Sequence, residues 1–183
     1  MVFWEEIDPT QIELVALNKD RTRFRYKGGP LRFQIPRGSC SGVNAFKSLQ
    51  VELVHDEFAE WWRQLELQLC PLEPFNSNLR AIGGASNGNL VHSLRLKIDD
   101  SVYVFDKDSK QINPEIREGV FRGQDVSCLI DVDSTYFFNG NWGLTIRVYQ
   151  IKTLTDSVSE SAEDSSRESF SLPKGTCAFL SEE

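Results

Sequence analysis

The sequence predicts a mainly β domain, built as a small antiparallel barrel or a β-sandwich, with one helix in the middle of the chain. Three observations favour this fold class. Several short segments alternate apolar and polar residues, as half-buried strands do, and turn-forming residues separate them. A single segment, residues 56–69, has the spacing of an amphipathic helix. From residue 156 onward the composition changes to serine and acidic residues, so we expect one domain over residues 1–155 and a flexible tail over residues 156–183.

The first expected strands lie between residues 10 and 35. Residues 10–18 form one strand, and residues 21–27 alternate strictly, which places every second side chain on one face. That face carries Arg21, Arg23, Arg25 and Lys27. The glycines and proline at 28–30 indicate a turn, and residues 31–35 form the next strand. Residues 39–42 are expected to be a loop.

The helix follows a strand at residues 49–54. Asp56 is a suitable N-cap, and prolines at 71 and 74 end the helix. We expect both tryptophans, Trp61 and Trp62, to lie in the core. The apolar stripe of the helix consists of Phe58, Trp61, Trp62, Leu65 and Leu69.

The second half of the chain predicts strands at residues 91–98, 101–105, 125–132, 136–138 and 143–154, with residues 79–89 as a loop. Asn139-Gly140-Asn141 is a strong hairpin signal between the last two strands. Leu144, Ile146 and Val148 are expected on the buried side of the last strand.

Charge is distributed unevenly along the chain. The net charge is −7, and residues 156–183 contribute seven acids and two bases, which is −5. Residues 19–37 hold seven bases and one acid, which is +6. A cationic segment and an anionic tail on a nearly neutral body suggest a polyanionic partner and a tail that interacts separately.

Aromatic residues on the expected strands are interleaved with basic ones. Cations that contact phosphates and flat side chains that stack on bases are what a sequence-tolerant single-stranded nucleic-acid groove needs. Most of the aromatics must be core, but Tyr103 and Tyr136 are favoured over Phe105 and Phe138 because a phenol tolerates a wet groove. Trp142, next to the hairpin turn, is a further candidate. From these patterns the expected interface includes Arg21, Arg23, Arg25, Tyr26, Tyr103, Tyr136 and Trp142.

Three sequence blocks resemble the single-stranded-DNA-binding proteins of large nucleocytoplasmic DNA viruses, which are relatives of the T7-type phage single-stranded-DNA-binding protein. The first is residues 26–37 with the Gly-Val-Asn step at 42–44. The second is residues 94–98 followed by Phe-Asp-Lys-Asp at 105–108. The third runs from residue 128 through the hairpin at 138–143 to residues 148–152. The blocks occur in the family's order over residues 10–154.

The resemblance implies an OB-fold-like antiparallel barrel that coats single-stranded DNA during replication or recombination, without catalysis. It also implies an acidic tail that recruits replication or recombination proteins and competes for the DNA groove. In this chain the tail acids are diluted with serine. The resemblance gives the phosphate-contacting role to Lys27, Arg32, Arg37, Arg95, Lys97, Arg147 and Lys152, and partner binding to Glu160, Glu163, Asp164, Glu168 and Phe179.

Two other function classes stay open. The chain is alternatively a structural or interaction protein, for example a virion component or an assembly adaptor, on a sandwich or barrel. It is alternatively an enzyme in which Asp131 and Asp133 hold Mg²⁺, although two acids on a predicted hairpin are more often simply solvated. A homodimer is also left open.

No cofactor or metal is expected. The sequence has no P-loop or dinucleotide motif, and its four cysteines and two histidines have no zinc-ligand spacing, so we expect reduced cysteines. It has no apolar run near the ~20 residues of a membrane span and no signal-peptide pattern. A soluble intracellular protein without membrane contact is the expectation, located in the host cytoplasm or nucleus if it is viral.

Overall fold

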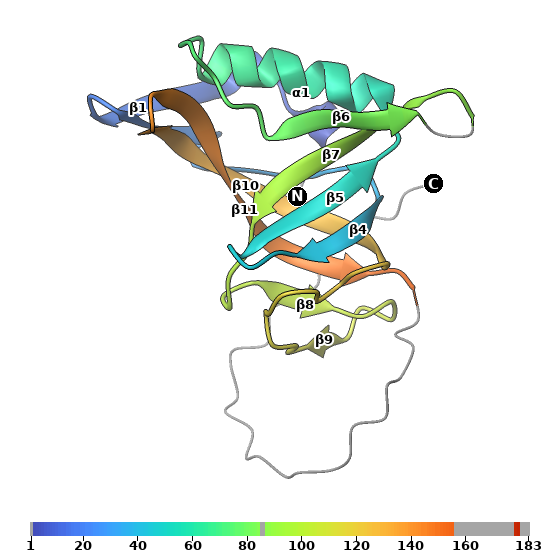
Figure 1. Ribbon diagram of the computed structural model, residues 1–183. Coiled ribbons are helices and arrows are strands. Elements are labelled where there is room, and N and C mark those ends of the chain that lie inside the picture. The colour runs from blue at the N-terminus through green and yellow to red at the C-terminus, as the bar shows by residue number, and fades with distance from the viewer. Residues whose placement is uncertain (1, 85–86, 156–177, 180–183) are drawn as a thin grey trace.

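The computed structural model describes residues 2–84, 87–155 and 178–179 (Figure 1). The fold is mainly β, with one α-helix, α1 (Asp56–Leu69), and two short 3₁₀ turns before the first strand. In chain order the strands are β1 (Ile12–Asn18), β2 (Arg21–Tyr26), β3 (Gly29–Gln34), β4 (Gly38–Val43), β5 (Ser48–Leu53), β6 (Leu79–Gly84), β7 (Leu90–Lys97), β8 (Tyr103–Phe105), β9 (Gln111–Ile112), β10 (Asp125–Phe138) and β11 (Asn141–Thr153).

Five of these strands close a barrel, in the pairing order β4–β5–β7–β11–β10 and back to β4. The predicted OB-fold-like barrel is therefore confirmed, with one difference. β7 and β11 run parallel, with Lys97 opposite Arg147, so the barrel is mixed rather than antiparallel. The parallel pair arises because the chain passes through β10, antiparallel to β11, before β11 enters the sheet beside β7.

The remaining strands extend the barrel sheet. β3 pairs with β10 and carries β2 and β1 beyond it, while β8 and β9 extend the sheet from β11. β6 pairs with β7, and Figure 1 shows α1 lying across one end of the barrel beside β6. No helix in the described part of the chain is long and apolar enough to cross a membrane.

The helix has the predicted bounds, and its apolar stripe faces the core. Trp62 is fully buried, and Trp61 is half-buried against the core cluster. Their rings pack on Phe33, with centroid distances of 5.3 Å for Trp61 and 6.4 Å for Trp62. The N-cap is His55 rather than Asp56, because the His55 Nδ1 accepts from the Phe58 N–H at 3.1 Å. Asp56 is instead the first helical residue, where its negative charge interacts favourably with the positive end of the helix dipole.

Two segments expected to be loops are strands. Residues 39–42 belong to β4, and residues 79–84 form β6. Both are rich in small residues and lack a visible alternation of apolar and polar side chains. In β4 the small residues are needed, since Gly38 lies directly against β5.

We expect Gly38→Ala to destabilise the fold by about 3 kcal/mol, at the upper end of the usual cost of overpacking a tight site. A Cβ at Gly38 would lie 2.6 Å from the Glu52 carbonyl oxygen and 2.6 Å from Val51 Cγ1. Gly29→Ala is the matched control, since its nearest contact would be 3.8 Å away. Urea unfolding of both variants measures the difference, and equal losses would contradict this account of β4.

Three cysteines in the described part of the chain, Cys40, Cys70 and Cys128, are free and buried. Burial raises the pKa of the Cys40 thiol to about 11 and also raises that of Cys128. These thiols are therefore protonated near neutral pH and pack as small apolar side chains.

Candidate nucleic-acid interface

A groove of about 720 Å³ lies on the outer surface of the barrel, between the β4–β5 loop and the β10–β11 hairpin. It brings together residues from separate parts of the chain. Its lining consists of Asn44, Phe46, Lys47, Ser48, Asn76, Asn78, Arg95, Lys97, Tyr136, Phe138, Leu144, Thr145 and Ile146.

The strand β7 supplies two cations to this groove. Leu94, Leu96 and Ile98 are buried, so the intervening Arg95 and Lys97 point outward. Neither cation makes an ion pair within the described part of the chain. Lys47, on the loop beside them, pairs with Asp100 at 3.0 Å, but both side chains are at least half exposed. Such exposed pairs contribute little, so Lys47 can exchange its partner for a phosphate.

The loop between β4 and β5 projects an exposed phenylalanine. The Asn44 side chain accepts from the N–H groups of Phe46 and Ser48 at 2.9 and 3.0 Å, which fixes the turn. Lys47 adopts a left-handed conformation, with φ of 53°. As a result Phe46 is 89% exposed, although aromatic side chains normally lie in the core.

The hairpin between β10 and β11 supplies aromatic side chains to the other side of the groove. Asn139 and Gly140 both have positive φ, as a two-residue type I′ turn requires, so the hairpin signal is confirmed. Phe138, beside this turn, is 68% exposed. The Tyr136 ring lies over Gly143 on β11, where a Cβ would meet it at 2.5 Å. The groove therefore has an exposed phenylalanine on each side and cations between them.

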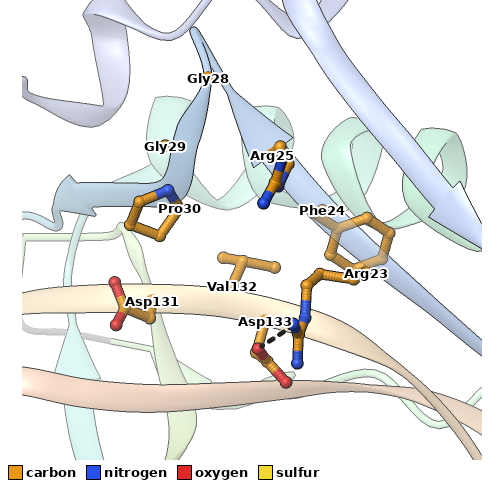
Figure 2. A pocket seen from close by; sticks show the side chains of 9 residues that line it. All are labelled: Arg23, Phe24, Arg25, Gly28, Gly29, Pro30, Asp131, Val132 and Asp133. Atoms are coloured by element: carbon orange, nitrogen blue, oxygen red, sulfur yellow. Dashed lines mark ion pairs between the residues drawn. The ribbon is translucent and has the colours of Figure 1, made fainter. Parts of the chain in front are cut away.

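The cationic face of β2 is a separate surface. Arg21 and Arg23 both pair with Asp133 of β10, at 3.2 and 3.7 Å. Figure 2 shows Arg23 joined to Asp133 in a pocket of about 290 Å³ that Arg25 and Asp131 also line. The carboxylates of β10 therefore neutralise much of this face.

Tyr26 does not reach the surface that the sequence predicts for it. It is 7% exposed, and its hydroxyl accepts from the Asp8 N–H at 3.2 Å. The basic side chains of β2 alternate with it, so Lys27, just after the strand, is exposed while Tyr26 joins Phe24 in the core. We therefore leave Tyr26 out of the interface.

A third group of predicted residues lies on β3, β8 and β11 and on the connection from β3 to β4. Arg32 binds Asp131 through two hydrogen bonds of 2.5 and 3.0 Å, and its guanidinium stacks 3.4 Å above the Tyr149 ring. Tyr103 contacts the same ring edge-on, at 5.6 Å between centroids. The other members are also engaged: Arg37 with Asp125, Arg147 with Asp99, and Lys152 with Ser109.

Asp131 and Asp133, considered above as Mg²⁺ ligands, therefore both face arginines. Within the described residues, no group of three or more histidine, cysteine, aspartate or glutamate side chains is arranged to hold a metal ion.

The structure changes the choice of aromatic residues. Phe105 is buried, but Phe138 is more exposed than Tyr136, which is half-buried in the groove. Trp142 is half-buried against Phe137, at 5.0 Å between ring centroids, and lies outside the groove lining. Phe46, Lys47 and the asparagines were missed, since they lie in segments without strand alternation. The Asn-Gly turn was the available signal for Phe138.

The predicted tail residues Glu160, Glu163, Asp164 and Glu168 lie outside the described residues. Phe179 is described, and its ring meets the ring of Phe105 edge-on at 6.3 Å between centroids. The neighbouring Ala178 N–H donates to the Gln150 side-chain oxygen at 3.2 Å. Phe179 thus contacts β8, while its neighbour contacts β11.

The fold and the groove together define an OB-like barrel with a surface groove of basic side chains and exposed aromatic rings, in which Arg95 and Lys97 make no ion pair with any described residue. No protein-family model matches the chain, and no curated protein matches it in sequence. Among solved structures it is similar to the single-stranded DNA-binding protein from bacteriophage Enc34, with a TM-score of 0.51 and 17% identity over 83% of this chain and 96% of that one. It is also similar to gp2.5, a single-stranded DNA-binding protein encoded by bacteriophage T7, with a TM-score of 0.41 and 11% identity over 73% and 98% of the two chains. At this identity the Enc34 similarity shows a shared fold.

Proposed function

We propose that this chain binds single-stranded DNA in the groove without sequence preference and without catalysis. The observation that carries the proposal is the pair Arg95 and Lys97, which make no ion pair within the described residues and lie between two exposed phenylalanines. OB-folds bind oligonucleotides on the face of their second and third strands and in the adjoining loops. In this barrel those strands are β5 and β7, and the loops are the β4–β5 loop, which carries Phe46, and the β10–β11 turn, which Phe138 precedes. The Enc34 protein, which has a similar fold, is a single-stranded DNA-binding protein.

The chemistry of the groove favours unpaired bases. A phenylalanine ring can stack only on a base whose face is free, which a duplex does not offer, and every base has such a face. The negative phosphates of the DNA backbone can compensate the positive charges of Arg95 and Lys97, which no described carboxylate pairs with. The preference for single-stranded over double-stranded DNA and the tolerance of any base sequence therefore follow from the same residues.

Our proposal extends to a role in DNA replication or recombination, with partner recruitment by residues 156–183. These parts rest on the three sequence blocks, which resemble the viral single-stranded-DNA-binding proteins, and on the tail charge of −5.

The test is fluorescence anisotropy of a labelled oligo-dT, with a duplex of equal phosphate content beside it. With three phosphate contacts, from Lys47, Arg95 and Lys97, the log–log salt slope should be about −2.1. Affinity should then fall roughly 20-fold between 50 and 200 mM salt, and the duplex should bind more weakly. A flat salt response, or equal affinity for the duplex, would overturn the proposal.

A second candidate, an interaction protein without nucleic-acid binding, is favoured by the outer edge strand β1. Leu14, Val15 and Leu17 on this strand are 56%, 38% and 46% exposed, and such an edge can pair with another chain. This interpretation predicts no oligonucleotide binding even at low salt, so the same titration distinguishes the two.

A further inference from the structure

A buried carboxylate lies behind the groove. Glu66 is on the core-facing side of α1 and is only 4% exposed. Its Oε2 accepts from the Ser77 hydroxyl at 2.6 Å, and its Oε1 accepts from the Asn78 N–H at 3.0 Å. Burial raises the pKa of Glu66, while these hydrogen bonds oppose that shift. A buried acid is retained at low cost only when it is hydrogen-bonded, and here both bonds go to one segment.

That segment, residues 74–78, forms one wall of the groove, and we call it the wall segment. Asn78 is bonded to the main chain of Arg95 twice: its carbonyl accepts from the Arg95 N–H at 2.9 Å, and its Nδ2 donates to the Arg95 carbonyl at 3.0 Å. At its other end, the Asn76 N–H donates to the Trp142 carbonyl at 2.8 Å, and the Trp142 N–H donates to the Pro74 carbonyl at 2.8 Å. The wall segment thus links β7 at Arg95 to β11 just after the hairpin turn.

We propose that Glu66 is a positioning residue for the DNA groove: through Asn78 it holds the main chain of Arg95 where the guanidinium meets the DNA backbone. This inference rests on the proposed function of the groove. Glu66 does not line the groove. Its effect on binding must therefore pass through the wall segment, and the Arg95→Ala background can separate that effect from a general effect on the structure.

The test is a double-mutant cycle between Glu66 and Arg95, read as affinity for oligo-dT in the full chain. Coupled residues in one network show non-additive effects of about 2- to 150-fold, and we expect Glu66→Ala to weaken binding about tenfold when Arg95 is present. In the Arg95→Ala background the same substitution should have no further effect. Glu66→Gln should recover the affinity lost in Glu66→Ala, because its amide oxygen can accept from Asn78 and its NH₂ group can donate to Ser77.

The matched control is Glu60→Ala, since Glu60 is on the same helix but its side chain is 65% exposed. It should leave affinity unchanged. Thermal unfolding by circular dichroism establishes that each variant is folded at the assay temperature. If Glu66→Ala does not fold, Ser77→Ala enters the cycle in its place, because it removes one of the two bonds.

Three outcomes are decisive. Equal losses from Glu66→Ala in the wild-type and Arg95→Ala backgrounds would show that Glu66 acts on the structure in general, and no loss at all would show that it does not act on binding. Either result overturns the positioning role. If Arg95→Ala alone leaves binding unchanged, the proposed groove is wrong, and the positioning role falls with it.

Discussion

Replacing two of the groove cations, in the Arg95→Ala/Lys97→Ala variant, is expected to lower affinity for single-stranded DNA roughly 100-fold or more, since each charge-assisted hydrogen bond is worth about 1.5–3 kcal/mol. Neither side chain has an ion-pair partner within the described residues, so a phosphate can interact with the full positive charge of each. Loss of two phosphate contacts should also make the log–log salt slope shallower by about 1.4. Anisotropy titrations of labelled oligo-dT at several salt concentrations measure both quantities.

The Arg21→Ala/Arg23→Ala variant is the matched control, because it removes the same charge from the surface. Asp133 already pairs with both of these arginines, at 3.2 and 3.7 Å. We expect a loss of about fivefold or less, from the weakened long-range field alone. If this variant loses as much affinity as the groove variant, the DNA follows β2 and the groove assignment is wrong.

Most of the fold was predictable from local patterns. The helix at Asp56–Leu69 has the predicted bounds because its apolar spacing and its flanking prolines are both visible in the sequence. The β10–β11 hairpin is equally local, since one Asn-Gly pair supplies the two positive φ angles. β4 and β6 were missed because their pairing depends on partners elsewhere in the sheet rather than on their own alternation. The parallel pairing of β7 with β11 is also a property of the whole barrel.

The site was harder to predict, because it too depends on contacts between distant parts of the chain. The alternation of Arg21, Arg23 and Arg25 is visible within seven residues, but the carboxylate that neutralises the first two is Asp133, more than a hundred residues later. Arg95 and Lys97 were among the candidate cations and both line the groove, but nothing local shows that they make no ion pair within the described residues. Phe46 and Phe138 lie 92 positions apart in the sequence and meet at one groove only after the barrel closes.

The Phe46→Ala/Phe138→Ala variant is expected to weaken binding about 30-fold or more, because each base–aromatic stack contributes about 1–3 kcal/mol. The two side chains are 89% and 68% exposed, so they contribute little to the core. The free energy of unfolding should therefore change by less than about 0.5 kcal/mol, as is usual for exposed positions. Urea unfolding and anisotropy titration together separate the two effects.

The salt dependence of this aromatic variant provides a second and independent criterion. Stacking neutralises no phosphate and releases no counterion, so the log–log slope should stay at the wild-type value of about −2.1 while the affinity falls at every salt concentration. Leu14→Ala/Leu17→Ala is the control, since it removes two exposed apolar side chains from β1, outside the groove lining, and should leave affinity unchanged. A steep loss of affinity in that control would place the DNA, or a chain contact needed for binding, at the β1 edge. An aromatic variant that binds like the wild type would leave the groove as a site for phosphates without base stacking, and the preference for single strands would then need another origin.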